Sequence, residues 1–296
     1  MDKKNIFLSG GNGFIGRNIL EQLSGKYEIS APGRQELDLL DALAVEHFIR
    51  QNDFEVVIHA ANIGGNRKDP GPQNMAELNM RMFFNIVRCK KHFGKMIHLG
   101  SGAEYGKQRD LKTVREDEFD LVVPSDQYGF YKYICSKYIE NTSNITCLRI
   151  FGCYGKYEDY EYKFISNAIC RALFGMPIKI TNMNVAFSYL YIDDLIRIVD
   201  HFIAKDGSHK FYNMAPDEIT DLLKIAKLVK AQSGVEKDIE IGKPGLGLEY
   251  TGSNELLKKE MVNFRFTPIK EGIEKLYKWY SENKNSIDKG RLSYPG

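Results

Sequence analysis

Short apolar runs alternate with amphipathic stretches through the first half of this 296-residue chain. The apolar runs have the length of buried strands, and the stretches between them repeat apolar residues with the period of a helix. Strands are predicted at 5–9, 27–31, 56–60, 95–100 and 146–151, and helices from the turn at 10–16 to about residue 24 and at 42–52, 72–92 and 128–141. This alternation predicts an α/β fold with a doubly wound parallel sheet.

Beyond residue 155 the alternation becomes less regular. Helices are predicted at 163–174, 192–204, 220–233 and 268–282, with a short strand at 178–181 and a Gly/Pro-rich loop at 242–252. We expect this part of the chain to form a small C-terminal α+β lobe that packs on the edge of the sheet.

Composition and charge exclude several classes of protein. The chain is 43% hydrophobic and 27% charged with a net charge of +2, which argues against nucleic acid as a partner. Its five cysteines lack the spacing of a metal site or a disulfide framework, which is typical of a reducing compartment. No apolar run reaches the roughly 18 residues of a membrane span, and the N-terminus lacks a signal peptide's apolar core. We expect a soluble cytoplasmic protein with no metal site and no membrane contact.

A glycine-rich turn follows the first predicted strand. The stretch 9–16, Ser-Gly-Gly-Asn-Gly-Phe-Ile-Gly, fits both G-x-x-G-x-x-G and G-x-G-x-x-G. Glycines let the backbone approach a pyrophosphate, and the following helix supplies free N–H groups and the positive end of its dipole. Because a hydrophobic strand precedes the turn and an amphipathic helix follows it, the pattern predicts a dinucleotide-binding fold of the Rossmann type.

The residues after the second predicted strand bear on which dinucleotide binds. NAD enzymes carry an acidic residue about 20 positions past the last glycine, where it holds the ribose hydroxyls. Here Arg34 stands eighteen positions after Gly16, and an arginine can pair bidentately with the 2′-phosphate of NADP. A shifted register that uses Glu36 or Asp38 favours NAD instead, and an Arg34 in a solvated loop favours neither. We expect Asp38 and Leu39 in a short third strand that faces the adenine, and NADP(H) as cofactor with NAD(H) as the alternative.

Two Tyr-x-x-x-Lys pairs occur in the predicted helix 128–141, Tyr128 with Lys132 and Tyr133 with Lys137. Residues four apart lie on one helix face, where the lysine charge stabilises a phenolate and lets the tyrosine act as an acid–base group. The pairs differ by five positions, about 140° around the axis, so only one of them can face a cofactor.

Seven segments taken together resemble the extended short-chain dehydrogenase/reductases, specifically the NAD(P)-dependent epimerase/dehydratase family that acts on nucleotide sugars. They appear in the order that is usual in the family: 10–16, 38–41, 59–62, 99–106, 128–132, 148–155 and 191–195. The stretch 63–66 and the overall length look most like the GDP-L-fucose synthase and dTDP-4-dehydrorhamnose reductase types.

The resemblance implies a catalytic role for three residues. The family serine lies in Gly-Ser-x-x-x-Tyr-Gly, here Ser101, and the tyrosine follows some 25 residues later with a small residue behind it, which selects Tyr128 over Tyr133. Tyr128 exchanges the hydroxyl proton, Lys132 holds the nicotinamide ribose and Ser101 orients the reacting oxygen. Cofactor contacts are implied for Gly10, Gly13, Phe14, Ile15, Gly16, Arg34, Asp38, Leu39, Ala60, Ala61 and Lys132. The implied cofactor domain is 1–155 with about 183–215, and the implied substrate lobe is about 156–182 and 216–296.

Departures from the family pattern narrow the implied reaction. Family dehydratases carry an Asp-Glu pair directly after the catalytic serine or threonine, where this chain has Gly102 and Ala103, which transfer no proton. The cysteine and histidine with which fucose synthases epimerise correspond to Ala103 and Lys163. The arginine that often holds the substrate diphosphate is Phe187, and a usual asparagine is Gly152. Substrate contacts are therefore sought at Lys163, Arg171 and Lys179.

The resemblance and its departures together imply an NADPH-dependent reductase of a 4-keto-6-deoxy nucleotide sugar, which would make a deoxysugar for surface polysaccharide. A nucleotide-sugar 4-epimerase with tightly bound NAD is the first alternative, because it uses the same three residues. A non-catalytic NADP-sensing protein is the second. The family usually pairs its subunits through the helices predicted here at 72–92 and 128–141, so a homodimer is expected.

Overall fold

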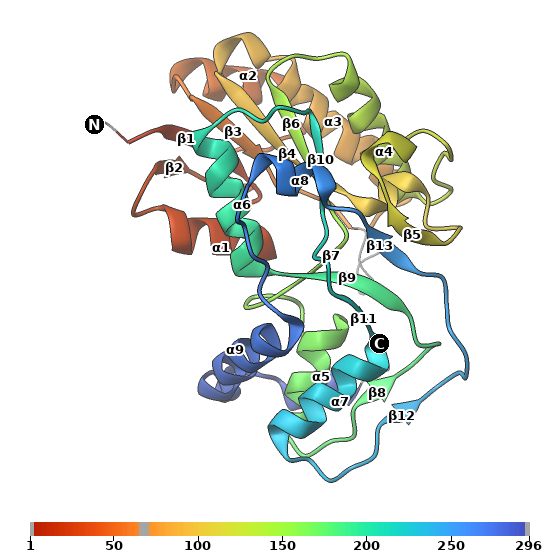
Figure 1. Ribbon diagram of the computed structural model, residues 1–296. Coiled ribbons are helices and arrows are strands. Elements are labelled where there is room, and N and C mark those ends of the chain that lie inside the picture. Colours follow the sequence, from red (N-terminus) through yellow and green to blue (C-terminus); the bar gives the residue numbers. More distant parts are fainter. Residues whose placement is uncertain (1–2, 65–70, 294–296) are drawn as a thin grey trace.

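A central parallel sheet, covered by helices, lies above a smaller lobe in the computed structural model, which describes residues 3–64 and 71–293 (Figure 1). The strand order is β2-β1-β3-β4-β6-β10, and every neighbouring pair is parallel. The strands are β1 (Asn5–Ser9), β2 (Glu28–Ser30), β3 (Val56–His59), β4 (Lys95–Ser101), β6 (Ile145–Ile150) and β10 (Phe211–Met214). The predicted α/β fold with a doubly wound parallel sheet is thus confirmed.

Helices cover both faces of this sheet because its strands are apolar on both sides. In β1, Ile6 and Leu8 pack into one buried cluster and Phe7 into another, as the two-residue period of a strand requires. The helices α1 (Phe14–Leu23) and α6 (Ile192–Ala204) pack together on one face. The other face carries α2 (Ala42–Gln51), α3 (Met75–Val87) and α4 (Gln127–Glu140).

The chain reverses its direction across the sheet between β1 and β3. From β1 it adds β2 on one side and then β3 on the other, so the carboxyl ends of β1 and β3 border a crevice. Glycine is required there, since Gly10 has φ +78° and a Cβ on it would lie 2.7 Å from the Ala61 backbone nitrogen. A Cβ on Gly16 would overlap the Gly10 carbonyl oxygen.

The C-terminal part adds a second, mixed sheet of order β11-β9-β13-β5, with β7 paired to β9. Helices α5, α7 and α9 pack against one another in the lower lobe of Figure 1. The new elements are β5 (Leu111–Val114), β7 (Gly152–Tyr154), α5 (Phe164–Leu173), β8 (Lys179–Ile180), β9 (Ala186–Tyr191), β11 (Ile219–Asp221), α7 (Leu222–Ser233), β12 (Glu240–Ile241), β13 (Tyr250–Gly252), α8 (Glu255–Glu260) and α9 (Ile269–Glu282).

Three expectations about local structure are wrong. Asp38 and Leu39 form a turn instead of a third strand, because the Leu40 N–H donates to the Asp38 carboxylate at 3.0 Å. The helix predicted at 72–92 is shorter: α3 ends at Val87 and a 3₁₀ turn, η1 (Lys90–His92), follows. The loop predicted at 242–252 contains β13. The stretch 63–66 lies partly outside the described residues.

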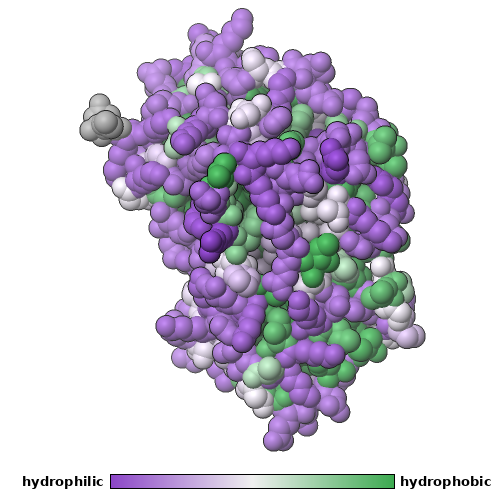
Figure 2. Space-filling view, in the orientation of Figure 1, coloured by the Kyte–Doolittle hydropathy of each residue, from purple (hydrophilic) through white to green (hydrophobic). Residues whose placement is uncertain are grey.

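Apolar side chains gather over the lower part of the face shown in Figure 2, whereas the upper part is largely polar. The large apolar residues that are exposed in the C-terminal part of the described chain are Met183, Ile219, Ile241, Leu246, Leu248 and Val262. No helix within residues 3–64 and 71–293 is both long and apolar enough to cross a membrane.

Candidate active site

A cavity of about 1030 Å³ opens at the carboxyl ends of the central strands. It extends from the glycine turn to the end of β4 and the first turns of α4. The predicted site residues that line it are Gly10, Gly13, Phe14, Ile15, Gly16, Arg34, Asp38, Leu39, Ala60, Ala61, Ser101, Tyr128, Lys132 and Lys163. The fold therefore brings residues from six separate segments of the sequence to one cavity.

The glycine turn ends at an uncapped helix N-terminus. Helix α1 begins after Gly13, the Gly13 N–H donates to the Gly10 carbonyl at 3.0 Å, and no described side chain caps the helix. The first-turn N–H groups are therefore available to an anion, and the helix dipole favours one there. A turn that only glycine can form, followed by free N–H donors, fits the pyrophosphate of a dinucleotide.

The far end of the same cavity presents Arg34 and Asp38. Arg34 is exposed and forms no ion pair or hydrogen bond with any residue of the described chain. Glu36 does not line the cavity, because its carboxylate accepts the Gly33 N–H at 2.6 Å. The geometry therefore gives Glu36 a local role in the turn and leaves Arg34 and Asp38 facing the cavity.

Ser101 lies at the end of β4, where the chain turns into the 3₁₀ helix η2 (Gly102–Tyr105). Its Oγ accepts the Ala103 N–H at 3.1 Å as the cap of that helix. Lys132 reaches the same strand from α4, since its buried Nζ donates to the Leu99 carbonyl. Tyr128 is half-buried one helical turn before Lys132.

The second Tyr-x-x-x-Lys pair faces elsewhere. The Tyr133 hydroxyl and the Lys137 Nζ both bond to Asp120, and neither residue lines the cavity. The small residue behind Tyr128 also has a reason: a Cβ on Gly129 would lie 2.8 Å from the Ala103 carbonyl oxygen. Helix α4 can therefore approach η2 closely enough for Tyr128 to share the cavity with Ser101.

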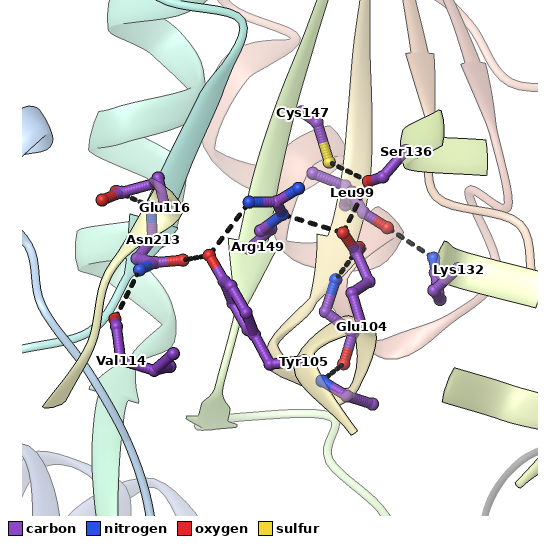
Figure 3. Close-up of polar contacts among 12 residues, drawn as sticks. Leu99, Glu104, Tyr105, Val114, Glu116, Lys132, Ser136, Cys147, Arg149 and Asn213 are labelled. Carbon is purple, nitrogen blue, oxygen red and sulfur yellow. Dashed lines mark hydrogen bonds and ion pairs between the residues drawn. The ribbon is translucent and has the colours of Figure 1, made fainter. Parts of the chain in front are cut away.

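A buried ion pair supports this arrangement (Figure 3). Glu104 Oε1 accepts the Ser101 N–H at 2.8 Å, while Oε2 accepts from Arg149 Nε at 2.8 Å and from Ser136 Oγ at 2.5 Å. Ser136 lies on α4, one turn after Lys132. One carboxylate therefore connects the strand end that carries Ser101 to the helix that carries Tyr128.

Sequence reasoning missed a second tyrosine at Ser101. Tyr250, on β13, lines the cavity, and its side chain lies near enough to Ser101 for the serine to lower its pKa. Burial raises the pKa of the Tyr250 phenol, and the nearby Ser101 side chain opposes the shift only in part. Tyr250 is therefore a neutral hydroxyl at physiological pH. No local signal marks it, because it follows a Gly/Pro-rich stretch and its neighbours in space are remote in sequence.

A second cavity of about 380 Å³ lies between α5 and β8, and the residues sought as substrate contacts border it. Arg171 is buried and its guanidinium already donates to the carbonyls of Pro177, at 2.6 Å, and Leu292. Lys179 pairs with Glu240 at 2.8 Å. Lys163 lines both cavities. Of the three cations, Lys163 is therefore the one that faces both spaces without a described ion-pair partner.

The sequence matches the model of the NAD dependent epimerase/dehydratase family over residues 6–215. The chain belongs to this family. It is 29% identical to the GDP-L-colitose synthase of Yersinia pseudotuberculosis over 53% of this chain and 55% of that protein. It is 22% identical to a dTDP-4-dehydro-6-deoxy-D-allose reductase of a Streptomyces species over 95% of this chain and 97% of that one.

Solved structures of family members share the whole fold. The UDP-glucose 4-epimerase of Thermotoga maritima superposes with a TM-score of 0.81 at 20% identity, over 95% of this chain and 99% of that one. A GDP-L-fucose synthetase of Naegleria fowleri bound to NADP gives 0.80 at 18% identity, over 98% and 96%. Members of this nucleotide-sugar family thus include both reductases and epimerases. In the described residues, no cluster of His, Cys, Asp and Glu is arranged to hold a metal ion.

Proposed function

We propose that the protein is an NADPH-dependent reductase of a 4-keto-6-deoxy nucleotide sugar. One observation carries the proposal: Ser101, Tyr128 and Lys132 line one cavity with the glycine turn, while the neighbouring Gly102 and Ala103 have no side chain that transfers a proton. Reduction of a ketone needs one hydride and one proton, and it needs no further acid or base.

The residues of the chain bind the carbonyl oxygen, supply the proton and stabilise the resulting charge. Bound NADPH supplies the hydride. Ser101 Oγ and the Tyr128 hydroxyl are positioned to bind the carbonyl oxygen, and Tyr128 gives that oxygen its proton. Lys132 stands one turn away, where its charge favours the tyrosinate that results. Its bond to the Leu99 carbonyl holds the ammonium group on the cavity side of β4.

The preference for NADP rests on Arg34. Its guanidinium borders the cavity without a described partner, whereas Glu36 is bound to the turn. A 2′-phosphate at this end would give Arg34 the partner it lacks. Solved structures with the same fold hold NADP or NAD, so the choice depends on Arg34.

The substrate class rests on the second cavity and the relatives. A nucleotide sugar whose sugar reacts at Ser101 can extend its diphosphate past Lys163 toward Lys179. The relatives named as colitose synthase and 4-dehydro-6-deoxy-allose reductase support a 4-keto-6-deoxy sugar. The deoxysugar product would be used in the synthesis of a surface polysaccharide. We also propose a homodimer through α3 and α4, whose outer faces expose Phe84 and Phe130.

The alternative with specific support is a nucleotide-sugar 4-epimerase with tightly bound NAD. The same three residues serve it, and the Thermotoga maritima epimerase shares the fold over nearly the whole chain. Cofactor content separates the two functions. Protein purified without added cofactor should carry no NAD if it is a reductase and a stoichiometric amount if it is an epimerase.

Turnover tests the proposal directly. Purified protein is given NADPH or NADH with a panel of dTDP-, GDP-, CDP- and UDP-4-keto-6-deoxy sugars, and the loss of reduced cofactor is followed by absorbance. We expect NADPH oxidation with at least one sugar. Conversion of a UDP- or dTDP-hexose into its 4-epimer without net oxidation of cofactor establishes the alternative, and inertness in every combination overturns both.

A further inference from the structure

An ionisable side chain that the proposed reaction does not use lies between the two cavities. Glu158 follows β7 in the chain and lines both cavities. Only 6% of the residue is exposed. The other residues that line both cavities are Phe151, Cys153, Asp159, Lys163 and Phe187. Glu158 is therefore a buried carboxyl group in the wall that joins the two spaces.

Only one of the two carboxyl oxygens of Glu158 accepts a hydrogen bond from a described residue. Ser166 Oγ donates to its Oε2 at 2.6 Å, and no described residue donates to Oε1. Burial disfavours the charged form of a carboxyl group, so Glu158 tends to hold a proton. Burial raises the pKa of Glu158 to about 7, although Lys163 and the Ser166 bond oppose the shift.

Other charged and titratable groups face Glu158 from three elements and from its own segment. Asp159 and Lys163 act from its own segment, Cys153 acts from β7, and Ser166 lies on α5. Tyr280, on α9, donates to the Glu158 carbonyl. Burial raises the pKa of the Cys153 thiol and of the Tyr280 phenol, so both stay neutral. No histidine lines either cavity in the part of the chain that the structure describes.

The wall that carries Glu158 lies where the middle of a nucleotide sugar must pass. The sugar has to reach Ser101 in the first cavity, and the second cavity is open to the nucleoside. The diphosphate between them then lies beside Glu158 and Lys163. Negative phosphate oxygens repel a carboxylate but accept a hydrogen bond from a carboxylic acid.

We propose that Glu158 binds the substrate diphosphate as a protonated hydrogen-bond donor, so that binding of the nucleotide sugar takes up a proton. This inference rests on the proposed nucleotide-sugar function. It assigns a substrate contact to a residue that lines the same two cavities as Phe187, which stands where an arginine is frequent in the family. Lys163 supplies the positive charge, and Glu158 supplies a donor that is present only at lower pH.

Calorimetry measures this proton directly. UDP-glucose, dTDP-glucose, GDP-mannose and CDP-glucose are titrated into protein saturated with NADP⁺, at pH 6 to 8.5, in pairs of buffers that differ in ionisation enthalpy. These sugar nucleotides have no phosphate group that titrates in this range. We expect proton uptake that approaches one per ligand at pH 8, with little uptake at pH 6. The Kd should rise by about tenfold per pH unit above pH 7.

Two variants identify the group. Glu158→Gln replaces the acid by a permanent donor, so uptake should vanish and the Kd should become independent of pH. Asp159→Asn, a change in the neighbouring carboxylate, should keep the uptake at pH 8 near one proton per ligand and move only its midpoint to lower pH, because the Asp159 charge raises the pKa of Glu158. Two results overturn the inference and leave the proposed function intact. One is proton uptake that persists in Glu158→Gln, and the other is binding by the unaltered protein at pH 8 without proton uptake. Uptake seen when NADP⁺ binds alone would assign the proton to the cofactor diphosphate and overturns it too. Failure of every sugar nucleotide to bind overturns both proposals.

Discussion

Glu104 and Arg149 form an ion pair in which neither side chain reaches solvent, with 2.8 Å between Oε2 and Nε. The guanidinium lies between the rings of Phe119 and Phe211, 4.3 and 4.2 Å from their centroids. Removal of one partner would leave the other charge buried without compensation. Because Glu104 also accepts the Ser101 N–H, the same pair links the stability of the fold to the position of the serine.

Glu104→Gln should lower the free energy of unfolding by about 3–5 kcal/mol, because it leaves the Arg149 charge unpaired. Arg149→Met, which fills the space between the rings, should cost a similar amount. The double variant should lose much less unfolding free energy than the two single variants lose together, since both charges are then absent. Urea denaturation of the four proteins measures the coupling. Lys137→Met breaks an exposed pair with Asp120 and should cost only about 0.2–1 kcal/mol. Additive losses in the first set would show that the buried pair is not coupled.

Tyr128→Phe should lower kcat by roughly 10²–10⁴-fold, because it removes the proposed proton donor and keeps the ring. Tyr133→Phe, five positions along the same helix, should leave kcat within a factor of two, since its hydroxyl bonds to Asp120 outside the cavity. The rate of NADPH oxidation with the best 4-keto sugar measures both. Equal losses in the two variants would contradict the assignment of the catalytic pair.

Arg34→Ala should raise the Kd for NADPH by roughly 10–100-fold, the loss expected for a charge-assisted bond to the 2′-phosphate. The Kd for NADH should change little, because NADH has a hydroxyl there. Fluorescence titration of both cofactors gives the two constants. Arg50→Ala, an exposed arginine on α2 that pairs with Glu46, is the matched control. A parallel loss for NADH would mean that Arg34 does not distinguish the cofactors.

A pair of buried histidines should make the protein sensitive to acid. The rings of His59 and His98 stack at 5.4 Å beneath the sheet crevice, and neither ring nitrogen of His98 has a described partner. Burial, together with the charge of Lys132, lowers the pKa of His59 to about 3 and moves that of His98 well below its usual value. Both rings are therefore neutral in the folded protein.

The sign of the pH effect follows from these lowered pKa values. Above pH 6.5 neither state is protonated and the full stability is present. As the pH falls below 6.5, the histidines bind protons in the unfolded state but not in the folded state. The free energy of unfolding therefore falls by about 1.4 kcal/mol per pH unit for each ring. Between pH 7 and pH 5, the free energy of unfolding of His98→Phe should therefore fall by about 2 kcal/mol less than that of the unaltered protein. Denaturation at the two pH values checks this. His47→Phe, at an exposed site, should keep the original slope, and an unchanged slope in His98→Phe would contradict the account.

Elements with a strong local pattern could be predicted almost to the residue. The strand predicted at 5–9 and the helix predicted at 192–204 have the bounds of β1 and α6. The second sheet could not be predicted in this way. Its strand β13 pairs Tyr250 with Leu111, far away in the sequence. The strand has only three residues and glycines nearby, so it shows no alternation of apolar and polar positions. Pairing of that kind depends on which surfaces the rest of the fold presents.

The sequence by itself determined the parallel sheet and the glycine turn, because strand period and glycine backbone freedom act over a few residues. Helical spacing offered two Tyr-x-x-x-Lys pairs, and the resemblance to the family selected Tyr128 and Lys132 with Ser101. Only the tertiary structure decided that Arg171 is already bound to carbonyl groups and that Tyr250 lines the same cavity as Ser101. It also placed Glu158 between two cavities. These properties depend on burial and on partners from distant segments, and no short stretch of sequence contains them.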